Sequence, residues 1–417
     1  VAYTLSTGRE HQQYRYTTVG SNMNDIITNL RAIVSDRSFF KTLNKSPTRG
    51  IASGGDIIFV FPGQGSQYLH MGEHLYNHEI TYKKHMDHCA NIIKNIYKKR
   101  NITNISILDC IFGQNDNEDA ESFFSRPTIV QPSIFMTEYS LAKTFMDYGI
   151  IPIALSGHSI GEYVAATIAG VFSLKDALEL IVLRGIATEE HSSNGNMLSI
   201  SNLNENLLNE LLKRHSNISV ATHNAPGMYV LSGSPNDIEE LHANVKDIIG
   251  KMVEEKTNLS DKPIRAVLLH VNRAFHSPLM EPAANILEEF LQGITINSPF
   301  IPVTSNVTGG WMTDDCKEPK YWGDHMKKTV RFVENAKCLQ QWNADAIVEI
   351  GPGSTLCKLI KKCMSTDNLP SIIPSMRHPK ATDVTDSRVF HSTLGKLWSS
   401  GVSCDWNKYY KLRSSSS

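Results

Sequence analysis

The sequence predicts an α/β fold in which helices cover a parallel sheet. Two short apolar segments, 57–61 and 150–155, each run into a glycine-rich turn, and a helical pattern follows the second turn. The stretch 197–271 instead alternates short strands and helices in the order βαββαβ. Strand, tight turn and helix in succession favour parallel strands, and the βαββαβ order is typical of a ferredoxin-like insertion.

Periodicity and turn residues place the individual elements. In chain order we expect a helix over 24–36, strands over 57–61 and 150–155, helices over 162–171 and 174–186, a strand over 197–200, a helix over 204–214, a hairpin of strands over 218–222 and 228–231, a helix over 235–248, and strands over 264–271, 302–305 and 346–350. Gly, Ser and Pro cluster over 45–55, which marks a domain boundary, and the polar stretch 113–119 predicts a surface loop.

Length and charge limit the classes of function. A chain of 417 residues is long enough for two or three compact units. Its 41 Lys and Arg residues balance 42 Asp and Glu residues, so neither a nucleic acid nor an anionic membrane is an expected partner. Apolar runs such as 56–61 are far shorter than the roughly 20 residues of a membrane-spanning helix.

The cysteines and the first residues bear on compartment and context. The seven cysteines include no Cys-x-x-Cys pair, which argues against a disulfide framework and against a zinc site. We expect reduced thiols in a cytoplasmic protein that binds no metal and no cofactor. The start at Val1 has neither an initiator Met nor a signal-peptide pattern, so we expect a segment of a longer polypeptide.

The segment Gly157-His158-Ser159-Ile160-Gly161 matches Gly-x-Ser-x-Gly, the pattern of a nucleophile elbow. Such a turn needs glycines where a Cβ would clash, and it exposes the serine Oγ at the carboxyl edge of the sheet. The N–H of Ile160 then lies at a helix N-terminus, where it helps to bind an oxyanion. The alternative is a tight turn whose serine only caps the helix.

A serine hydroxyl needs a base to act as a nucleophile. Of the 16 histidines, His276 is the candidate, because it follows the last strand of the insertion, where the chain returns towards the sheet. The alternative for His276 is an ordinary surface or core histidine, and His158 is expected to pack structurally. Gln64, in the turn after the first strand, is a candidate for a second oxyanion donor. That turn lacks Gly-Lys-Ser/Thr, so it is not a P-loop.

Arg184 ends an apolar helical segment. One interpretation is a partner for the negative end of the helix dipole. The other is a bidentate clamp on a substrate carboxylate, a role that suits the planar guanidinium group.

Taken in order, these segments resemble an acyltransferase domain of a modular type I polyketide synthase, in the family of malonyl-CoA:acyl-carrier-protein transacylases. The resemblance covers nearly the whole chain. It rests on Phe61-Pro62-Gly63-Gln64-Gly65-Ser66-Gln67, Gln131-Pro132-Ser133, 157–163, Arg184-Gly185, Asn224-Ala225-Pro226-Gly227, Ala274-Phe275-His276-Ser277-Pro278, Thr329-Val330-Arg331-Phe332 and Glu349-Ile350-Gly351-Pro352-Gly353. The end segments 2–9 and 394–406 resemble the linkers that precede and follow such a domain.

The resemblance implies an α/β-hydrolase-like large subdomain, an inserted ferredoxin-like small subdomain and an N-terminal α/β linker domain. It divides the chain into a ketosynthase–acyltransferase linker over 1–55, a large subdomain over 56–195 and 272–385, a small subdomain over 196–271, and a post-acyltransferase linker over 386–417. It also implies a ketosynthase domain upstream in the same polypeptide.

The resemblance implies a catalytic set as well. Ser159 would be the nucleophile and His276 its base, and a backbone carbonyl, matched to Arg331, would orient the imidazole in place of a third-residue carboxylate. The N–H groups of Gln64 and Ile160 would bind the oxyanion. The reaction would load a malonyl-type extender unit from acyl-CoA, the donor substrate, onto the phosphopantetheine thiol of an acyl carrier protein through an acyl-serine, in polyketide biosynthesis.

The implied substrate site consists of Arg184, which would bind the free carboxylate of the acyl group, with Gln131, Asn224, Ala274 and Phe275. Malonyl-selecting relatives carry His-Ala-Phe-His where methylmalonyl types carry Tyr-Ala-Ser-His. This chain reads Arg-Ala-Phe-His over 273–276. Phe275 fills the space of an α-methyl group, which favours malonyl-CoA, although one methyl discriminates only modestly.

Three alternatives stay open. The first is the same reaction with methylmalonyl-CoA or another substituted malonyl-CoA. The second is a serine esterase or thioesterase, against which stand Arg184 and the lack of an identifiable carboxylate for a triad. The third is an inactive docking module, against which stand the intact Ser159, His276 and Arg184.

Overall fold

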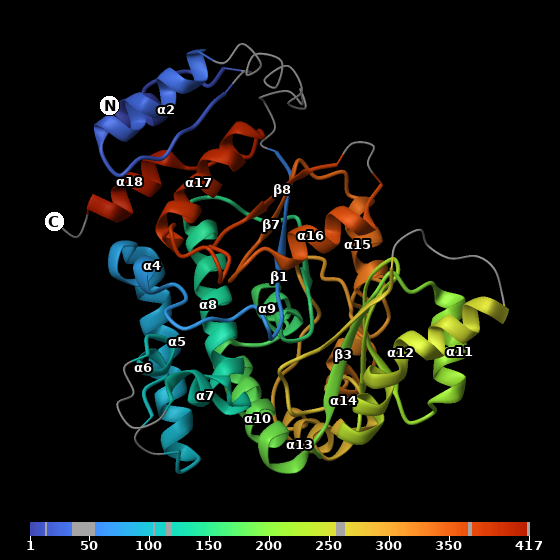
Figure 1. The fold of residues 1–417 in the computed structure, drawn as a ribbon. Coiled ribbons are helices and arrows are strands. Elements are labelled where there is room, and N and C mark those ends of the chain that lie inside the picture. Colours follow the sequence, from blue (N-terminus) through green and yellow to red (C-terminus); the bar gives the residue numbers. More distant parts are fainter. Residues whose placement is uncertain are drawn as a thin grey trace.

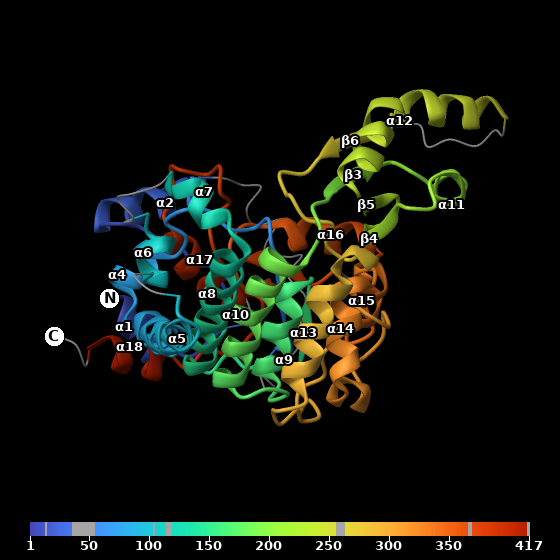
Figure 2. The ribbon, with the colours of Figure 1, turned by 90° about the horizontal axis from the view of Figure 1, so that it is seen from below.

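The computed structural model describes residues 1–12, 15–35, 55–102, 105–113, 119–255 (the backbone alone over 246–255), 263–365 and 369–414. Two sheets and the helices around them form the protein (Figure 1). Helices pack around the larger, parallel sheet, and the smaller, antiparallel sheet lies to one side of this body with two helices of its own (Figure 2).

The larger sheet has four parallel strands in the order β2-β1-β7-β8. Their bounds are β1 (Ile57–Phe61), β2 (Ala154–Gly157), β7 (Ala346–Glu349) and β8 (Ser371–Pro374). All five residues of β1 are buried, as expected for a central strand with helices on both faces. Because side chains alternate along a strand, Ile57, Phe59 and Phe61 face one core, whereas Ile58 and Val60 face another.

Helices of two groups cover these two faces (Figure 1). The first core receives α5, α8, α9 and α10, and the second receives α15 and α16. The helical elements around the larger sheet are α4 (Glu73–His78), α5 (Ile80–Lys99), α6 (Ile107–Ile111), α7 (Ala120–Ser125), α8 (Pro127–Asp147), α9 (Ile160–Ile168), α10 (Leu174–His191), η1 (Pro278–Met280), α13 (Glu281–Leu291), η2 (Asp314–Lys317), α14 (Pro319–Lys327), α15 (Phe332–Gln340), α16 (Thr355–Cys363) and α17 (Asp386–Ser399).

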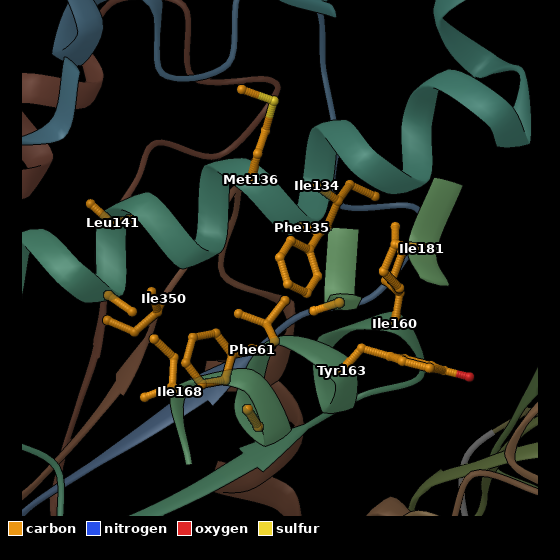
Figure 3. Close-up of a cluster of buried hydrophobic side chains, with 14 of the residues drawn as sticks. Phe61, Ile134, Phe135, Met136, Leu141, Ile160, Tyr163, Ile168, Ile181 and Ile350 are labelled. Atoms are coloured by element: carbon orange, nitrogen blue, oxygen red, sulfur yellow. The ribbon is translucent and has the colours of Figure 1, made fainter. Parts of the chain in front are cut away.

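The first core lies directly behind the Gly-x-Ser-x-Gly turn. Figure 3 shows Phe61 at the end of β1 close to Phe135 of α8 and to Ile160, the first residue of α9. Each of these side chains is fully buried. Burial of an aromatic or aliphatic side chain of this size contributes about 1.5–3 kcal/mol, so this cluster fixes the strand end and the helix start on either side of the turn.

The smaller sheet follows the βαββαβ order that the sequence predicts. It consists of β3 (Asn196–Ser201), α11 (Glu205–Arg214), β4 (Ser219–Ala225), β5 (Met228–Gly233), α12 (Pro235–Glu255) and β6 (Arg265–Leu268). The strand order is β4-β5-β3-β6 and every pair is antiparallel, which confirms the ferredoxin-like fold of this part. A bridge between Thr222 of β4 and Val330 ties this sheet to the larger body.

Three strand expectations need correction. The second strand begins at Ala154 rather than at 150, because Pro152 has no N–H to offer a ladder. The stretch 302–305 joins the sheet by a single bridge, from Val303 to Leu155, and forms no full strand. The edge strand β8 was not expected, since Pro370 precedes it, Pro374 is its last residue, and these prolines interrupt the pattern.

The first and last helices of the chain lie side by side (Figure 1). The N-terminal helices are α1 (Ala2–Thr7) and α2 (Met23–Ser35), and the last helix is α18 (Trp406–Ser414). The guanidinium of Arg15 lies over the Trp398 ring at 4.9 Å and donates to the Trp398 carbonyl at 2.9 Å.

On α2 the apolar side chains Ile27, Leu30 and Val34 are 37%, 44% and 75% exposed, so the described residues leave part of this helix's apolar surface uncovered. His11, Arg15 and Thr17, which precede α2 in the chain, contact α17. The expected boundary at 45–55 and the loop at 113–119 fall almost wholly outside the described residues, and over 1–35 the described residues form helices and no strand.

The core behind the elbow yields a stability prediction. Phe135→Ala should lower the free energy of unfolding by about 3–5 kcal/mol, because a buried ring leaves a cavity. Urea denaturation measures the change. The matched control is Phe300→Ala, whose ring is 73% exposed and whose loss should cost less than about 1 kcal/mol. Equal losses in the two variants would contradict the assignment of this core.

Candidate active site

The turn that carries Ser159 is strained. Between the end of β2 and the start of α9, Ser159 adopts φ 52° and ψ −118°, a region that residues other than glycine rarely occupy. A Cβ on Gly157 would lie 2.1 Å from the backbone nitrogen of Glu162, and one on Gly161 would lie 2.2 Å from the carbonyl oxygen of Phe61. Both glycines of the motif are therefore required by close backbone contacts.

Asn306 holds this turn from both sides. Its Oδ1 accepts the Ser159 N–H at 2.8 Å, and its Nδ2 donates to the Gly157 carbonyl at 2.7 Å. The backbone N–H of Asn306 in turn donates to Oε2 of Glu162 at 2.6 Å. Asn306 was not among the residues expected from the sequence, although its place just after the expected strand 302–305, at the carboxyl edge of the sheet, was a usable signal.

Glu162 is the buried carboxylate at the centre of this network. Besides the Asn306 N–H it accepts the hydroxyl of Tyr321 at 2.6 Å, through Oε1. Burial raises the pKa of Glu162 to about 8, and the two hydrogen bonds oppose that rise. The sequence patterns indicated no role for Glu162 or for Tyr321.

Ser159 and His276 come together as a hydrogen-bonded pair. The serine Oγ lies 2.7 Å from Nε2 of His276, and Nδ1 of the same ring lies 3.1 Å from the carbonyl oxygen of Lys328. With a proton on Nδ1 donated to that carbonyl, Nε2 carries the lone pair that accepts the serine proton.

The orienting carbonyl is that of Lys328, so the expected match to Arg331 is wrong. The extended residue after α14 turns its carbonyl towards the imidazole, whereas Arg331 lies three residues further on, where its N–H donates to the Asn306 carbonyl.

The environment of His276 keeps its imidazole neutral. The residue is 3% exposed. Burial, the Arg184 guanidinium and then His158 lower the pKa of His276 to about 3. No described Asp or Glu forms an ion pair with this ring. A neutral imidazole has the free lone pair that a general base needs.

Arg184 lies inside α10, with 2% of its surface exposed. Its Cζ is 5.6 Å from the ring centre of Tyr163, and no described carboxylate forms an ion pair with it. Since α10 continues to His191, Arg184 is not at the helix end, and the dipole-partner interpretation is wrong. Gly185 allows the close approach of α8, because a Cβ there would lie 2.6 Å from the Pro127 carbonyl oxygen.

Two backbone N–H groups flank Ser159 on the expected sides. The turn at Gly63 touches the elbow, since a Cβ on Gly63 would meet the His158 carbonyl oxygen at 2.6 Å and the Ser159 Cβ at 3.4 Å. Within the described part of the chain, the N–H groups of Gln64 and Ile160 have no hydrogen-bond acceptor. The Ser159 N–H is occupied by Asn306, so these two N–H groups are the ones open to a ligand.

Two of the other predicted substrate residues, Gln131 and Asn224, contact residues next to the Ser159–His276 pair or to the turn at Gly63. Gln131 of α8 is fully buried, and its Nε2 lies 3.5 Å from Oε1 of Gln64. Oδ1 of Asn224 lies 2.7 Å from Nε2 of His158, within hydrogen-bond distance. Asn224 therefore positions the residue that precedes the nucleophile. His158 also packs on the Phe332 ring at 5.4 Å.

The segment 273–276 is anchored by Arg273. Its guanidinium donates to the carbonyl oxygens of Thr188 and Glu189 in the last turn of α10, at 3.1 and 2.8 Å. Arg273 is thus held by the end of α10. Ala274 is fully buried, and Phe275 packs against both the main core and the small cluster around Met197.

A cavity of about 450 Å³ opens beside His276, between β4 and the segment after α14. Its lining consists of Ser219, Val220, His276, Val307, Lys327, Lys328, Thr329 and Arg331. The segments that the structure describes contain no cluster of His, Cys, Asp and Glu placed to hold a metal ion. They also contain no helix with the length and apolar character needed to cross a membrane.

Comparisons with known proteins agree with this geometry. Residues 58–403 match the family model described as "Acyl transferase domain". The chain is 27% identical over 414 residues to the polyketide synthase GfsA of Streptomyces halstedii, and this alignment covers 98% of the chain. It is 28% identical over 412 residues to the mycoketide-CoA synthase of Mycobacterium tuberculosis, with 97% of the chain covered. The chain spans only 5% of the length of the first relative and 9% of the second.

Two solved structures are similar over most of the chain. One is the acyl transferase domain of SpnD in complex with 2-(pent-4-yn-1-yl)malonyl, with a TM-score of 0.79, 28% identity, and coverage of 95% of this chain and 87% of that one. The other is the malonyl CoA-acyl carrier protein transacylase of Clostridium perfringens, with a TM-score of 0.68, 25% identity, and coverage of 82% and 97%.

The depressed pKa of His276 predicts an unusual pH dependence for the reactivity of Ser159. Because the imidazole keeps its lone pair at every pH above about 3, labelling of Ser159 by a fluorophosphonate should proceed at a nearly constant rate between pH 8 and pH 5. A histidine of ordinary pKa would lose roughly 30-fold over that range. Intact mass measured against time gives the rate, with Ser159→Ala as the blank. An inflection near pH 6.5 would refute the prediction.

The Asn306 contacts predict a loss of the same reactivity. Asn306→Ala leaves the Ser159 N–H and the Gly157 carbonyl without partners, so labelling should slow by about 10- to 100-fold, corresponding to roughly 1–3 kcal/mol. Asn306→Asp keeps the acceptor for the Ser159 N–H but loses the donor to the Gly157 carbonyl. Its labelling rate should therefore lie between those of the wild-type protein and Asn306→Ala. Labelling of Asn306→Ala within twofold of the wild-type rate would count against a role in holding the turn.

Proposed function

The chain belongs to the acyl transferase domain family, and from this premise we propose that it transfers a malonyl-type acyl group from acyl-CoA to the phosphopantetheine thiol of an acyl carrier protein. The family confirms the resemblance that the sequence indicates and makes the protein an acyltransferase. The observation that carries the finer proposal is the hydrogen-bonded Ser159–His276 pair near the buried Arg184, which forms no ion pair with any described carboxylate.

In the first half-reaction, Nε2 of His276 takes the Ser159 proton as Oγ attacks the thioester carbonyl carbon. The new C–O bond places negative charge on the former carbonyl oxygen, and the N–H groups of Gln64 and Ile160 bind it. Each such donor is worth roughly 3 kcal/mol in the transition state. The C–S bond then breaks, the imidazolium returns the proton to the CoA sulfur, and an acyl-Ser159 ester remains.

In the second half-reaction, the thiol of the carrier protein attacks this ester. His276 takes the thiol proton, the same N–H groups bind the oxyanion, and the proton returns to Ser159 Oγ as the C–O bond breaks. The cavity beside His276 supports this step, since it gives an incoming thiol a route to the base. The name of the Clostridium perfringens relative, which includes an acyl carrier protein, supports this acceptor.

Arg184 couples substrate binding to the base. The guanidinium lowers the pKa of His276, and the carboxylate of a malonyl group bound to Arg184 offsets that charge. The imidazole then becomes more basic when a dicarboxylic acyl group is in place. A monocarboxylic acyl group leaves Arg184 buried and unpaired, which costs binding free energy.

Malonyl is the proposed acyl group because Phe275 occupies space that an α-substituent needs. The complex of the SpnD domain with a substituted malonyl group supports the malonyl class and leaves its substituent open. Methylmalonyl-CoA is therefore the alternative donor. The ketosynthase expected upstream stays a prediction of the sequence.

Intact mass after brief exposure to equimolar malonyl-, methylmalonyl- and acetyl-CoA tests the proposal. A malonyl-sized adduct should form on the wild-type protein and be absent from Ser159→Ala. Arg184→Ala should lose the malonyl adduct by at least tenfold, because the free carboxylate then lacks its cation.

The other outcomes are equally informative. A methylmalonyl adduct in place of malonyl would overturn the role of Phe275 and leave the mechanism intact. Rapid release of free CoA without any adduct would indicate a thioesterase and refute acyl transfer.

A further inference from the structure

Several buried polar atoms around Arg184 have no hydrogen-bond partner among the residues that the structure describes. They are Nε of Arg184, the hydroxyls of Tyr163 and Thr188, both ring nitrogens of His325, and Oε1 of Gln131. All five side chains are at most 2% exposed. We call these five residues the acyl chamber. A buried polar atom without a hydrogen bond is destabilising, so a group of them in one place indicates a ligand or ordered water.

Ring distances connect the acyl chamber to the Ser159–His276 pair. The His276 and His325 rings lie 6.0 Å apart, and the His325 and Tyr163 rings 5.0 Å apart. Arg184 Cζ is 5.6 Å from the Tyr163 ring centre, and Thr188 lies one helical turn beyond Arg184, on the same face of α10. Helices α8, α9, α10 and α14 thus each contribute a polar group to one buried region.

Packed aromatic rings hold Tyr163 in place. Trp322 packs on Tyr163 at 4.8 Å and on Phe172 at 4.8 Å, and its Nε1 donates to the Cys316 carbonyl. All three rings are buried. The Tyr163 hydroxyl therefore has a fixed position that a small acyl group meets without rearrangement.

His325 presents hydrogen-bonding capacity that its surroundings do not use. Its Nε2 is 3.7 Å from Oε2 of Glu162, too far for a hydrogen bond, and Glu162 already accepts from Asn306 and Tyr321. Burial first, then His276 and Arg184, lower the pKa of His325, so the ring is neutral. A neutral imidazole has one donor and one acceptor to offer.

We propose that Tyr163, Thr188 and His325 are specificity-determining residues, which together with Arg184 bind the carboxylate end of the acyl group. The inference rests on the proposed function, in which Arg184 binds that carboxylate. A carboxylate offers about four lone pairs, and the guanidinium fork occupies two of them. The two lone pairs that remain accept from donors among the Tyr163 hydroxyl, the Thr188 hydroxyl and one N–H of His325.

The same arrangement rejects acyl groups that lack a carboxylate. An acetyl group offers the Arg184, Tyr163 and Thr188 donors no carboxylate to bind, and a site built for hydrogen bonds discriminates strongly against an analogue that cannot make them. Selection for a dicarboxylic acyl group is then shared by several neutral groups, and Arg184 alone does not account for it.

Two near-isosteric variants test this inference. Tyr163→Phe and Thr188→Val each remove only a hydroxyl hydrogen bond. Each should lower kcat/KM for malonyl-CoA by about tenfold, and both together by more, while kcat/KM for acetyl-CoA stays within twofold or rises. His325→Phe should likewise lower the malonyl-to-acetyl ratio at least tenfold. The measurements are acyl-enzyme formation with each donor and fluorophosphonate labelling of the same preparations.

The matched control is Thr137→Val on α8. Thr137 is as buried as Thr188, but its hydroxyl lies beside that of Tyr82 of α5, in another part of the core. The ratio of kcat/KM for malonyl-CoA to kcat/KM for acetyl-CoA in Thr137→Val should equal that of the wild-type protein. Unchanged fluorophosphonate labelling of the chamber variants shows that they are folded and that Ser159 is intact.

Two outcomes overturn the inference. The first is an equal loss with malonyl- and acetyl-CoA, which means a structural role. The second is a ratio that does not differ from that of Thr137→Val. A failure of the proposed function gives a distinguishable result, because the wild-type protein then forms no malonyl adduct on Ser159. That result would refute the proposed function and this inference together.

Discussion

The backbone at Ser159 is the constraint on which the site depends. A residue with a side chain occupies φ 52° there, between two glycines whose neighbours leave no room for a Cβ. Such a conformation persists only where the surroundings determine it fully. The buried cluster around Phe61 and Ile160 fixes the strand end and the helix start, and Asn306 ties the two flanks of the turn together.

Few ion pairs compensate the charged and titratable groups around this turn. Arg184 is buried without a described carboxylate, while His276 and His325 are neutral because burial and the neighbouring cation oppose their protonation. The carboxyl group of Glu162, close to His325, is held by its own hydrogen bonds. The region thus has a positive potential that only a ligand with an anionic group neutralises, which relates the fold to the chemical class of the acyl group.

The His276 side of the site depends on the join between the two sheets. The loop after α14 gives the imidazole its carbonyl partner, and the next residues of the same loop pair with β4 of the small sheet. One short segment therefore orients the base and sets the position of the small subdomain. A movement between the subdomains would act directly on the imidazole, through the Lys328 carbonyl.

The sequence by itself determined the elements with strong local signals. The buried strand Ile57–Phe61, the βαββαβ insertion and the Gly-x-Ser-x-Gly turn follow from periodicity and from glycine at positions of close backbone contact. Ser159 belongs to this turn, and the place of His276 after the last strand of the insertion made it the candidate base. The resemblance to a family then assigned the roles of His276 and Arg184. The edge strand β8 lay outside these signals because its prolines interrupt the pattern.

Only the tertiary structure decided the contacts between segments far apart in the chain. Asn306 reaches Ser159 across 147 positions, and Lys328 rather than Arg331 orients His276 because of how the loop after α14 turns. Arg273 occupies the motif position of a histidine, yet it binds the end of α10. Tyr163, Thr188 and His325 carry no local signal of a role in binding. A binding role is indicated only by the tertiary structure, in which three helices place these polar atoms near one buried guanidinium, with no hydrogen-bond partner among the described residues.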